Sequence, residues 1–382
     1  MMKRLALSLL SLAAVLLAAG CAAKTPTSVK IGVFEPITGA NAGGGALEVE
    51  GVKLANELYP TVKVGDKEYP IELVISDNKS DKVEAANAAQ RLVDKDKVQV
   101  VLGSWGSSLS MAAGPIVQKA QVPAIGLSCT NPLVTKGNEY YFRVCFIDPF
   151  QGTVMANYAF KELKAKKAVI IREVSNDYSV GLAKYFEDSF KKLTGNDGAI
   201  LTELNYNTGD QDFSSQLTEV KKYSPDVIFA PGNFTESALL VKQARELGIK
   251  TPFLGGDTWE TPEFIDVGKE AVEGIVFSTF FATEVPITDT SKIFLDAYRK
   301  KYNKEPAAVT ALGFDGYLVA RDAIQRAGTL DTTKIRDAIN ETKDFPGAAG
   351  VINFDENRDA TKDAVIKVVK DGKFTYLTTV KP

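Results

Sequence analysis

The sequence contains no histidine among its 382 residues and only three cysteines. The lack of histidine excludes Ser-His catalytic triads and most zinc sites, because both depend on imidazole. The cysteines form no CxxC motif and do not have the spacing of metal ligands. No nucleophile with a matching base is visible either, which counts against an enzyme such as an amidase or another hydrolase.

The sequence also lacks an excess of charge of one sign. It has 45 Lys and Arg against 48 Asp and Glu, a net charge of −3 at pH 7, and the two signs are well mixed. Binding to nucleic acid requires a clustered basic surface, so we expect no nucleic-acid partner. Hydrophobic residues make up 45% of the chain, enough for a large core, and the length predicts two or three domains.

Two patterns that would indicate a cofactor or a metal are incomplete. Gly43-Gly44-Gly45 is rich in glycine but lacks the Lys-Ser/Thr that a phosphate-binding P-loop needs. Asp355, Glu356 and Asp359 are close together but do not have the spacing of an EF-hand, and a turn before the last strands explains them better. We therefore expect neither a cofactor nor a metal site.

The N-terminal segment has the pattern of a targeting signal. A basic head at Met1–Arg4 precedes an apolar run at Leu5–Leu17. A run of roughly 13 residues is too short for a transmembrane helix and suits the core of a signal peptide. No later segment is long and apolar enough to span a membrane, so we expect a mature protein that is soluble and lies outside the cytoplasmic membrane.

The sequence Leu17-Ala18-Ala19-Gly20-Cys21 resembles a bacterial lipobox, although Ala18 stands where a leucine is usual. We expect residues 1–20 to be a lipoprotein signal peptide, Cys21 to carry the lipid anchor, and residues 21–28 to form a flexible tether. The alternative is a plain secretory signal with an incidental cysteine. We expect the other two cysteines, Cys129 and Cys145, to be separate buried thiols, with a disulfide as the alternative because the compartment is oxidising.

Short apolar runs alternate with amphipathic helical patterns in the first part of the chain, which predicts a mostly parallel, doubly wound sheet. The expected strands are Val29–Phe34, Ile71–Ser76, Val98–Leu102, Val122–Leu127 and Tyr140–Phe146, and the expected helices are Glu48–Leu58, Val83–Val93 and Leu109–Lys119.

The same alternation then starts again, which indicates a second, similar lobe. Its expected strands are Ala168–Arg172, Ala199–Leu204, Val227–Ala230, Phe253–Gly255 and Gly274–Phe280, and its expected helices are Phe150–Leu163, Val180–Leu193, Leu217–Tyr223 and Ser237–Leu247. Three helices and a β-rich tail follow, at Ser291–Tyr302, Thr310–Ala327, Thr332–Asn340, Val351–Phe354, Val365–Val369 and Phe374–Leu377.

The fold class that we expect is therefore α/β, with two doubly wound parallel-sheet lobes. Residues 29–146 and 280–350 form lobe 1, and residues 147–279 and 351–382 form lobe 2. Several crossings of the chain between the lobes make a hinge, and a cleft between two domains is a preferred ligand site.

One stretch, Val98–Ser108, has the features of a binding loop in this cleft. An apolar strand ends at Gly103, a Gly/Ser loop with Trp105 follows, and a helical pattern begins near Leu109. Ligands of open α/β sheets bind at the carboxyl ends of the strands, and a helix N-terminus favours an anion such as a carboxylate. The alternative is an ordinary turn with a serine cap.

The order of motifs from about Val29 to Thr379 resembles the extracytoplasmic solute-binding proteins of branched-chain amino acid ABC transporters, which have a type I periplasmic-binding fold. The stretches that carry the resemblance are Lys30–Gly39, Val100–Gly103 with Ser107, Pro123–Gly126 through Thr130-Asn131-Pro132, Asn176–Gly181 and Phe253–Trp259. None of them is very specific alone, but they occur in the family's order behind a lipoprotein signal.

The resemblance implies a role for each site residue. In the first lobe, Ser107, Ser128 and Thr130 would hold the ligand's α-carboxylate, with Cys129 in the same loop. In the second lobe, Tyr178 and Asp257 would close over the ligand, and Asp257 would pair with its α-ammonium. Trp105, Trp259 and, more loosely, Asn233 with Phe234 would line the side-chain pocket. Without the resemblance, Asp257 could be a turn residue in solvent, Tyr178 a surface residue and Trp105 part of the core.

The ligand that the resemblance implies is leucine, isoleucine or valine. The family often has an aromatic residue near the end of its first Gly-rich loop, where this chain has Asn41–Gly45. These small residues leave room for an aromatic amino acid or a related carboxylate or amide. The implied partners are a membrane permease with its ATPase subunits, and we expect a monomer. A lipoprotein that senses its ligand without transporting it is the alternative.

Overall fold

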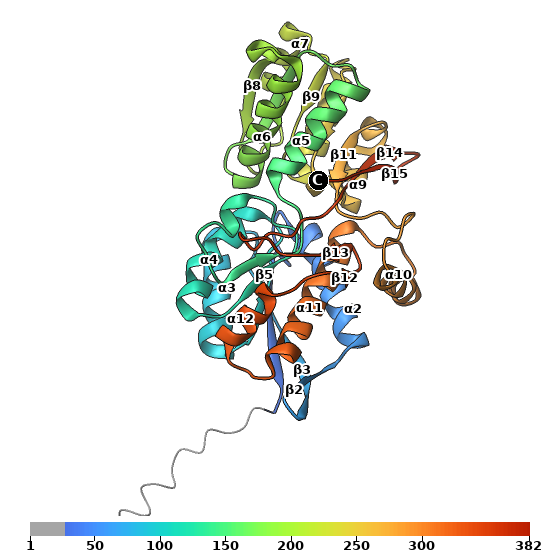
Figure 1. Cartoon of the computed structure of the whole chain (residues 1–382). Helices are drawn as coiled ribbons and strands as arrows, with labels where there is room; N and C mark the ends of the chain where they lie inside the picture. Colours follow the sequence, from blue (N-terminus) through green and yellow to red (C-terminus); the bar gives the residue numbers. More distant parts are fainter. Residues whose placement is uncertain (1–26) are drawn as a thin grey trace, which may run out of the picture.

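The computed structural model describes residues 27–382, and these form two α/β lobes that lie end to end (Figure 1). The predicted signal peptide, the lipidation site at Cys21 and most of the expected tether lie outside the described residues. Within residues 27–382, no helix has the length and apolar character needed to cross a membrane.

The first lobe is built on a sheet of six strands in the order β2-β3-β1-β4-β5-β6. Its strands are β1 (Val29–Glu35), β2 (Thr61–Val64), β3 (Lys67–Asp77), β4 (Val100–Leu102), β5 (Ala124–Gly126) and β6 (Tyr141–Arg143). All neighbours pair in parallel except β2 with β3. The register places Val33 of β1 opposite Ile75 of β3 and Leu102 of β4.

Helices cover both faces of this sheet, which is why its central strands are apolar throughout. The helices of this lobe are α2 (Ala42–Leu58), α3 (Lys82–Arg91), α4 (Ser107–Ala120), α10 (Asp289–Tyr302), α11 (Ala308–Ala327) and α12 (Thr332–Asn340). Val100 and Leu102 face one core with α2 and α11, whereas Val101 faces the other core with α3 and α4.

Glycines bring α2 and α11 into close contact. A Cβ atom on Gly51 would lie 2.0 Å from the carbonyl oxygen of Thr310, and one on Gly313 would lie 2.2 Å from that of Glu48. Only a residue without a side chain fits such an approach of two backbones. The contact fixes the middle of α2, and with it Glu48, against α11.

The second lobe has a sheet of seven strands in the order β15-β14-β11-β10-β9-β7-β8. Its strands are β7 (Ala168–Glu173), β8 (Ile200–Tyr206), β9 (Val227–Phe229), β10 (Phe253–Gly255), β11 (Val276–Thr279), β14 (Ala364–Lys370) and β15 (Lys373–Val380). The strands from β7 to β11 are parallel, and β14 and β15 extend the sheet in antiparallel pairs.

The helices of the second lobe lie on both faces of this sheet (Figure 1). They are α5 (Asp148–Asn157), α6 (Asp177–Thr194), α7 (Ser214–Tyr223), α8 (Phe234–Glu246) and α9 (Pro262–Gly268). Sequence periodicity predicts all of these helices except α9, a short helix of seven residues. It also misses β2 of the first lobe, a strand of four residues. Both elements are too short for a periodic pattern to stand out.

The chain passes between the lobes after β6, after β11 and again before β14. Before the last crossing, β12 (Phe345–Gly347) and β13 (Gly350–Ile352) form a separate hairpin. The strand expected at 351–354 is therefore β13, and it joins β12 instead of the second sheet.

The segment after β13 also stays beside the first lobe, although we expected lobe 2 to begin at residue 351. Phe354 packs on Phe142, with ring centroids 5.5 Å apart, and Asp359 forms a buried ion pair of 2.6 Å with Arg143. Pairing with the second sheet begins only at Ala364.

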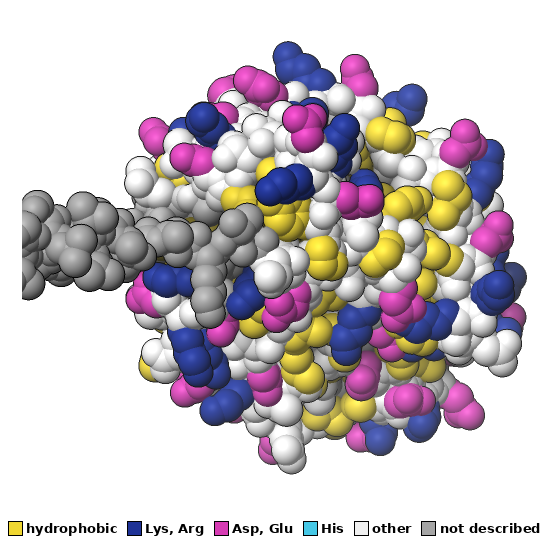
Figure 2. Space-filling model, turned by 90° about the horizontal axis from the view of Figure 1, so that it is seen from below, with side chains coloured by type: hydrophobic (Ala, Val, Ile, Leu, Met, Phe, Trp, Pro, Cys, Tyr) yellow, Lys and Arg dark blue, Asp and Glu magenta, His cyan; other side chains and the backbone are white. Residues whose placement is uncertain are grey.

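Two further features match the composition. Cys129 and Cys145 are free, buried thiols, which confirms the prediction of separate cysteines. On the face of the molecule seen in Figure 2, cationic and anionic side chains are interspersed, with apolar side chains between them.

Candidate functional site: the cleft between the lobes

A narrow cavity lies between the two lobes, at the ends of strands from both sheets. Loops after β4 and β5 supply one wall, and the start of α6, the loop after β9 and the short helix η5 (Asp257–Trp259) supply the other. Its lining residues are Trp105, Gly106, Ser107, Ser128, Asn176, Tyr178, Asn233, Asp257 and Thr258. The cavity therefore occupies the place where ligands of doubly wound folds bind.

The first lobe presents the start of α4 to this cavity. Gly106 precedes the helix with φ of 91°, a conformation that favours glycine, and no side chain caps the helix. The hydroxyl of Ser107 accepts a hydrogen bond of 3.1 Å from the backbone N–H of Asn131 and so joins the loops after β4 and β5. An uncapped N-terminus beside serine hydroxyls is suited to a carboxylate.

Trp105 forms the apolar part of the same wall. Its indole ring contacts the first turn of α2, where a Cβ atom on Gly44 would lie 2.4 Å from the ring. It also meets Phe234 of the second lobe edge to face, with centroids 5.8 Å apart. The space beside Gly44 is therefore taken by Trp105, whereas the room that the cavity leaves for a ligand's side chain stays a prediction.

The second lobe contributes a buried carboxyl group, that of Asp257. Its Oδ1 accepts hydrogen bonds of 2.7 Å from the Gln151 side-chain amide and 3.1 Å from the Tyr178 hydroxyl. Burial raises the pKa of Asp257 to about 7, although these two hydrogen bonds act to lower it. A cation in the cavity would favour the ionised carboxylate and would replace the solvation that Asp257 lacks.

Asparagine side chains connect the second lobe with the first at the edge of the cavity. Asn176 caps α6 by accepting from the N–H of Tyr178, and its amide donates to Asn233 at 3.1 Å. Asn233 in turn donates to Asn41 of the first lobe at 3.0 Å. These contacts show that the structure has the two lobes closed on each other.

Several polar atoms around the cavity are buried without a hydrogen-bond partner in the described part of the chain. They are Thr130 Oγ1, Gln151 Oε1, and both carboxyl oxygens of Glu48 and Asp148. Burial raises the pKa of Glu48 to about 7 and that of Asp148 to about 8. Such a concentration of unsatisfied polar groups is costly in a protein interior and is typical of a site that binds a polar molecule.

Six of the nine residues that we expected in the site line the cavity together: Trp105, Ser107, Ser128, Tyr178, Asn233 and Asp257. Cys129 and Thr130 lie in the same loop but are fully buried behind the wall. Trp259 packs in the second lobe, where its ring stacks on Phe264 and its N–H donates to the carbonyl of Gly232. This placement does not support a pocket role for Trp259.

Sequence reasoning missed other residues of the site. Asn176 and Thr258 flank predicted site residues and line the cavity, and Glu48, Asp148 and Gln151 lie just behind it. A signal existed for Glu48, because an acidic residue between Leu47 and Val49 falls on the buried face of an amphipathic helix. The sequence held no such signal for Asp148 and Gln151, because their helix, α5, comes close to the loop of Thr130 only through the hinge.

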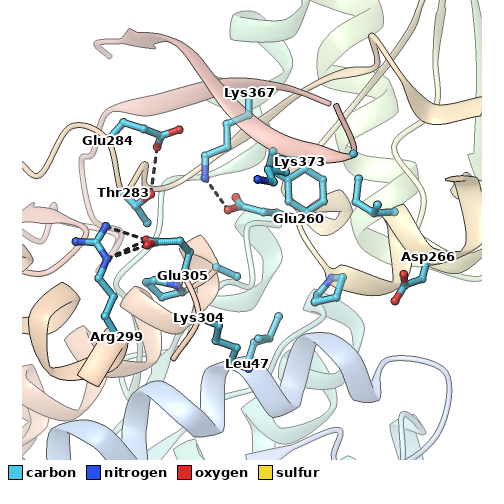
Figure 3. Close-up of a pocket in the computed structure, with 16 residues that line it drawn as sticks. Leu47, Glu260, Asp266, Thr283, Glu284, Arg299, Lys304, Glu305, Lys367 and Lys373 are labelled. Atoms are coloured by element: carbon cyan, nitrogen blue, oxygen red, sulfur yellow. Dashed lines mark hydrogen bonds and ion pairs between the residues drawn. The ribbon is translucent and has the colours of Figure 1, made fainter. Parts of the chain in front are cut away.

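A larger pocket of about 630 Å³ lies elsewhere along the boundary between the lobes (Figure 3). Four of its eight charged side chains pair with one another: Lys367 with Glu260 at 2.6 Å and Arg299 with Glu305 at 2.8 Å. Glu260 also accepts from the hydroxyl of Thr279 at 2.5 Å. These four charges are satisfied within the pocket, whereas polar atoms around the smaller cavity are buried without a partner in the described residues.

Among residues 27–382 no group of acidic or cysteine side chains is arranged to hold a metal ion. The features on which the function depends are thus the two facing walls of the cleft, one with a helix N-terminus and hydroxyls and the other with a buried carboxyl group.

A sequence model described as periplasmic binding protein matches residues 28–373. The chain belongs to the periplasmic binding protein family. This family consists of extracytoplasmic solute-binding proteins, a class without enzymatic activity, and the predicted type I periplasmic-binding fold is confirmed by the match and by the solved structures below.

Solved structures of similar periplasmic binding proteins cover nearly all of the chain. The leucine binding protein LivK from Thermotoga maritima is 44% identical, with a TM-score of 0.89 over 93% of this chain and 99% of that structure. A second structure, solved with isoleucine, is the branched-chain amino acid transporter substrate binding protein LivJ from Streptococcus pneumoniae. It is 35% identical, with a TM-score of 0.86 over 93% of this chain and 100% of that structure. A Leu/Ile/Val-binding protein homolog from Brucella melitensis is 28% identical over 97% and 99% of the two chains.

Proposed function

We propose that this periplasmic binding protein binds an amino acid in the cleft between its lobes and delivers it to the permease of an ABC transporter. The observation that carries the proposal is the pairing, across one cavity, of the α4 N-terminus with Asp257. A zwitterion needs an anion site and an acidic group a few ångströms apart, and the two lobes supply one each.

Leucine, isoleucine or valine is the ligand class that we propose. A branched aliphatic side chain suits the apolar surface of Trp105, which packs against Gly44. The proteins of 44% and 35% identity carry names that refer to leucine and to branched-chain amino acids, which supports this choice.

The predicted roles in the site are part of the proposal. Ser107, Ser128 and Thr130 bind the α-carboxylate with backbone N–H groups, Asp257 with Tyr178 binds the α-ammonium, and Trp105 and Asn233 border the side chain. Anchoring through a lipid on Cys21 and a monomeric state complete it. Closure of the lobes around the ligand then presents a defined surface to the permease.

Ligand binding by the refolded protein tests the proposal. Residues 27–382 are unfolded in denaturant, to remove any ligand retained from the cell, refolded, and assayed by thermal shift against the twenty amino acids. A ligand at a thousandfold excess over its Kd stabilises the folded state by about 4 kcal/mol, which raises the Tm by several degrees. We expect shifts with leucine, isoleucine and valine.

Other outcomes would change the proposal in defined ways. Shifts only with carboxylic acids that lack an amino group would retain the anion site and remove the role of Asp257. Shifts only with aromatic amino acids would contradict the ligand class. No shift with any amino acid would contradict the function itself.

A further inference from the structure

Glu48 has an unusual position in this site. It lies on α2 in the first lobe, it is fully buried, and neither of its carboxyl oxygens completes a hydrogen bond within the described residues. The hydroxyl of Ser128, which lines the cavity, and the carboxyl group of Glu35 both lie near it. A glutamine would fill the same volume without the cost of a buried acid, so packing alone does not explain a glutamate here.

The groups around Glu48 determine its protonation. Glu35 of β1 lies beside it and accepts the backbone N–H of Trp105 at 2.7 Å. Across the cavity, Asp257 acts on it electrostatically. Burial and the neighbouring carboxyl raise the pKa of Glu35 well above its usual range, so the Glu35–Glu48 pair retains protons near neutral pH.

Each lobe therefore contributes buried carboxyl groups to the cleft: Glu48 with Glu35 from the first, and Asp257 from the second. We propose that Glu48 recognises the ligand's ammonium group from the first lobe, through the hydroxyl of Ser128, so that the ammonium lies between two acids. When the hydroxyl of Ser128 donates to Glu48, its oxygen lone pairs point to the cavity and accept from the ammonium. The proposal rests on the proposed function with one change: the Ser128 hydroxyl faces the ammonium, and Ser107 and Thr130 hold the α-carboxylate. It makes Glu48 a positioning residue.

This arrangement explains why the lobes would close most firmly on a cationic ligand. Closure brings acids from both lobes together, and like charges in a buried site oppose each other unless they are protonated or paired with a cation. An ammonium group between Ser128 and Asp257 removes that opposition, and the carboxyl groups release protons as it binds. A carboxylate without an amino group gains nothing from either acid.

The experiment compares leucine with 4-methylpentanoate, the same molecule without its amino group. Affinities of both are measured by calorimetry for the wild type, for Glu48→Gln and for Glu50→Gln. Glu50 is the matched control, because it lies on the same helix but its carboxylate bonds outward to Tyr298 and Lys304. We expect Glu48→Gln to weaken leucine roughly tenfold or more and 4-methylpentanoate less than twofold, with no change in Glu50→Gln.

A purely structural role for Glu48 predicts a different result, since misfolding would weaken both ligands together. Equal losses, or no loss for leucine, would overturn the inference while leaving the proposed function intact. A wild type that binds no amino acid would instead overturn the proposed function and this inference with it.

A second measurement does not depend on the folding of Glu48→Gln. Leucine binding to the double variant Asp148→Asn/Asp257→Asn is measured at pH 7 in buffers of different ionisation enthalpy, which gives the number of protons released. Because Asp148, whose pKa burial raises to about 8, and Asp257 no longer titrate in this variant, we expect a remaining release from the Glu35–Glu48 pair. Binding without proton release in the double variant would overturn the inference.

Discussion

The carboxylate of Asp177 accepts a hydrogen bond of 2.7 Å from the hydroxyl of Ser108, across the cleft between the lobes. The same hydroxyl accepts the backbone N–H of Asp177 at 3.0 Å, so the N-termini of α6 and α4 bind each other through two groups. Lys82 of α3 adds an ion pair of 2.9 Å to Asp177. This cluster holds the closed arrangement together beside the ligand cavity.

Replacing Asp177 with alanine is therefore expected to favour the open arrangement. Partly exposed ion pairs contribute about 0.2–1 kcal/mol, so the ligand affinity should fall by a factor of roughly 1.4 to 5. Small-angle scattering without ligand should show a larger radius of gyration than the wild type. Asp188→Ala is the control, because Asp188 lies on the same helix but pairs only with Lys184. Identical scattering from both variants and the wild type would mean that Asp177 does not hold the lobes closed.

The pH dependence of this cluster has a defined sign. Burial alone would raise the pKa of Asp177, but hydrogen bonds from Lys82 and Ser108 lower it below the ordinary value of 3.8. Its contribution to closure is therefore complete above that value and is lost as the pH falls through the lowered pKa. We expect Asp177→Ala to change the radius of gyration by the same amount at pH 7 and at pH 5. Expansion between these two values that Asp177→Ala does not show would contradict this explanation.

Asp257→Asn should distinguish ligands with an amino group from those without one. A charge-assisted hydrogen bond in a buried site is worth about 1.5–3 kcal/mol, so leucine should bind roughly 10- to 100-fold more weakly. The affinity for 4-methylpentanoate should hardly change. Asp266→Asn is the matched control, since the Asp266 side chain is 74% exposed on a helix of the same lobe. Unchanged leucine affinity in Asp257→Asn would remove this residue from the site.

Gly44→Ala tests the contact between α2 and Trp105. Alanine favours a helix over glycine by about 1 kcal/mol, but its Cβ atom would lie 2.4 Å from the indole ring. We expect the overlap to dominate, with a net loss of about 1–3 kcal/mol in the free energy of unfolding and weaker ligand binding. Urea unfolding measures the loss in the free energy of unfolding. A shift in the fluorescence emission of Trp105, measured in a Trp259→Phe background, reports the displacement of its ring.

The control for that substitution is Gly198→Ala. Gly198 is exposed, and its Cβ atom would meet only the Asn196 side chain, at 3.3 Å. It should leave both the stability and the tryptophan emission close to those of the unsubstituted protein. A Gly44→Ala protein that is more stable than the wild type would mean that Trp105 moves aside at no cost.

Asp148 should make the unliganded protein less stable at higher pH. Burial raises its pKa from 3.8 to about 8, with Asp257 adding to the shift and Thr130 and Arg143 opposing it. Its protonated form stabilises the fold fully below the ordinary value, and that stability is lost as the pH rises through about 8. The Tm of the wild type should therefore fall more steeply between pH 5 and pH 8 than that of Asp148→Asn. Parallel curves would show that Asp148 does not titrate in this range.

The order of strands and helices could be predicted from the sequence because apolar periodicity reports which residues face a core. Val29–Phe34 became β1 and Phe253–Gly255 became β10, each within a residue or two of the observed bounds. The motif order also predicted the family, and with it most residues of the cleft. Ser107, Tyr178 and Asp257 follow strand ends, and strand ends of a parallel sheet share one edge.

Only the tertiary structure decided which side chains have no room and which polar groups have no partner. The glycines at 43–45 looked like open space in the sequence, yet Trp105, about sixty residues further along the chain, packs against Gly44. Trp259 looked like a pocket residue and lies in a core, while Glu48 looked like one residue of an amphipathic helix and lies buried behind the ligand site. Sequence periodicity records the side of an element on which a residue lies, whereas contact and desolvation depend on which distant element packs against that side.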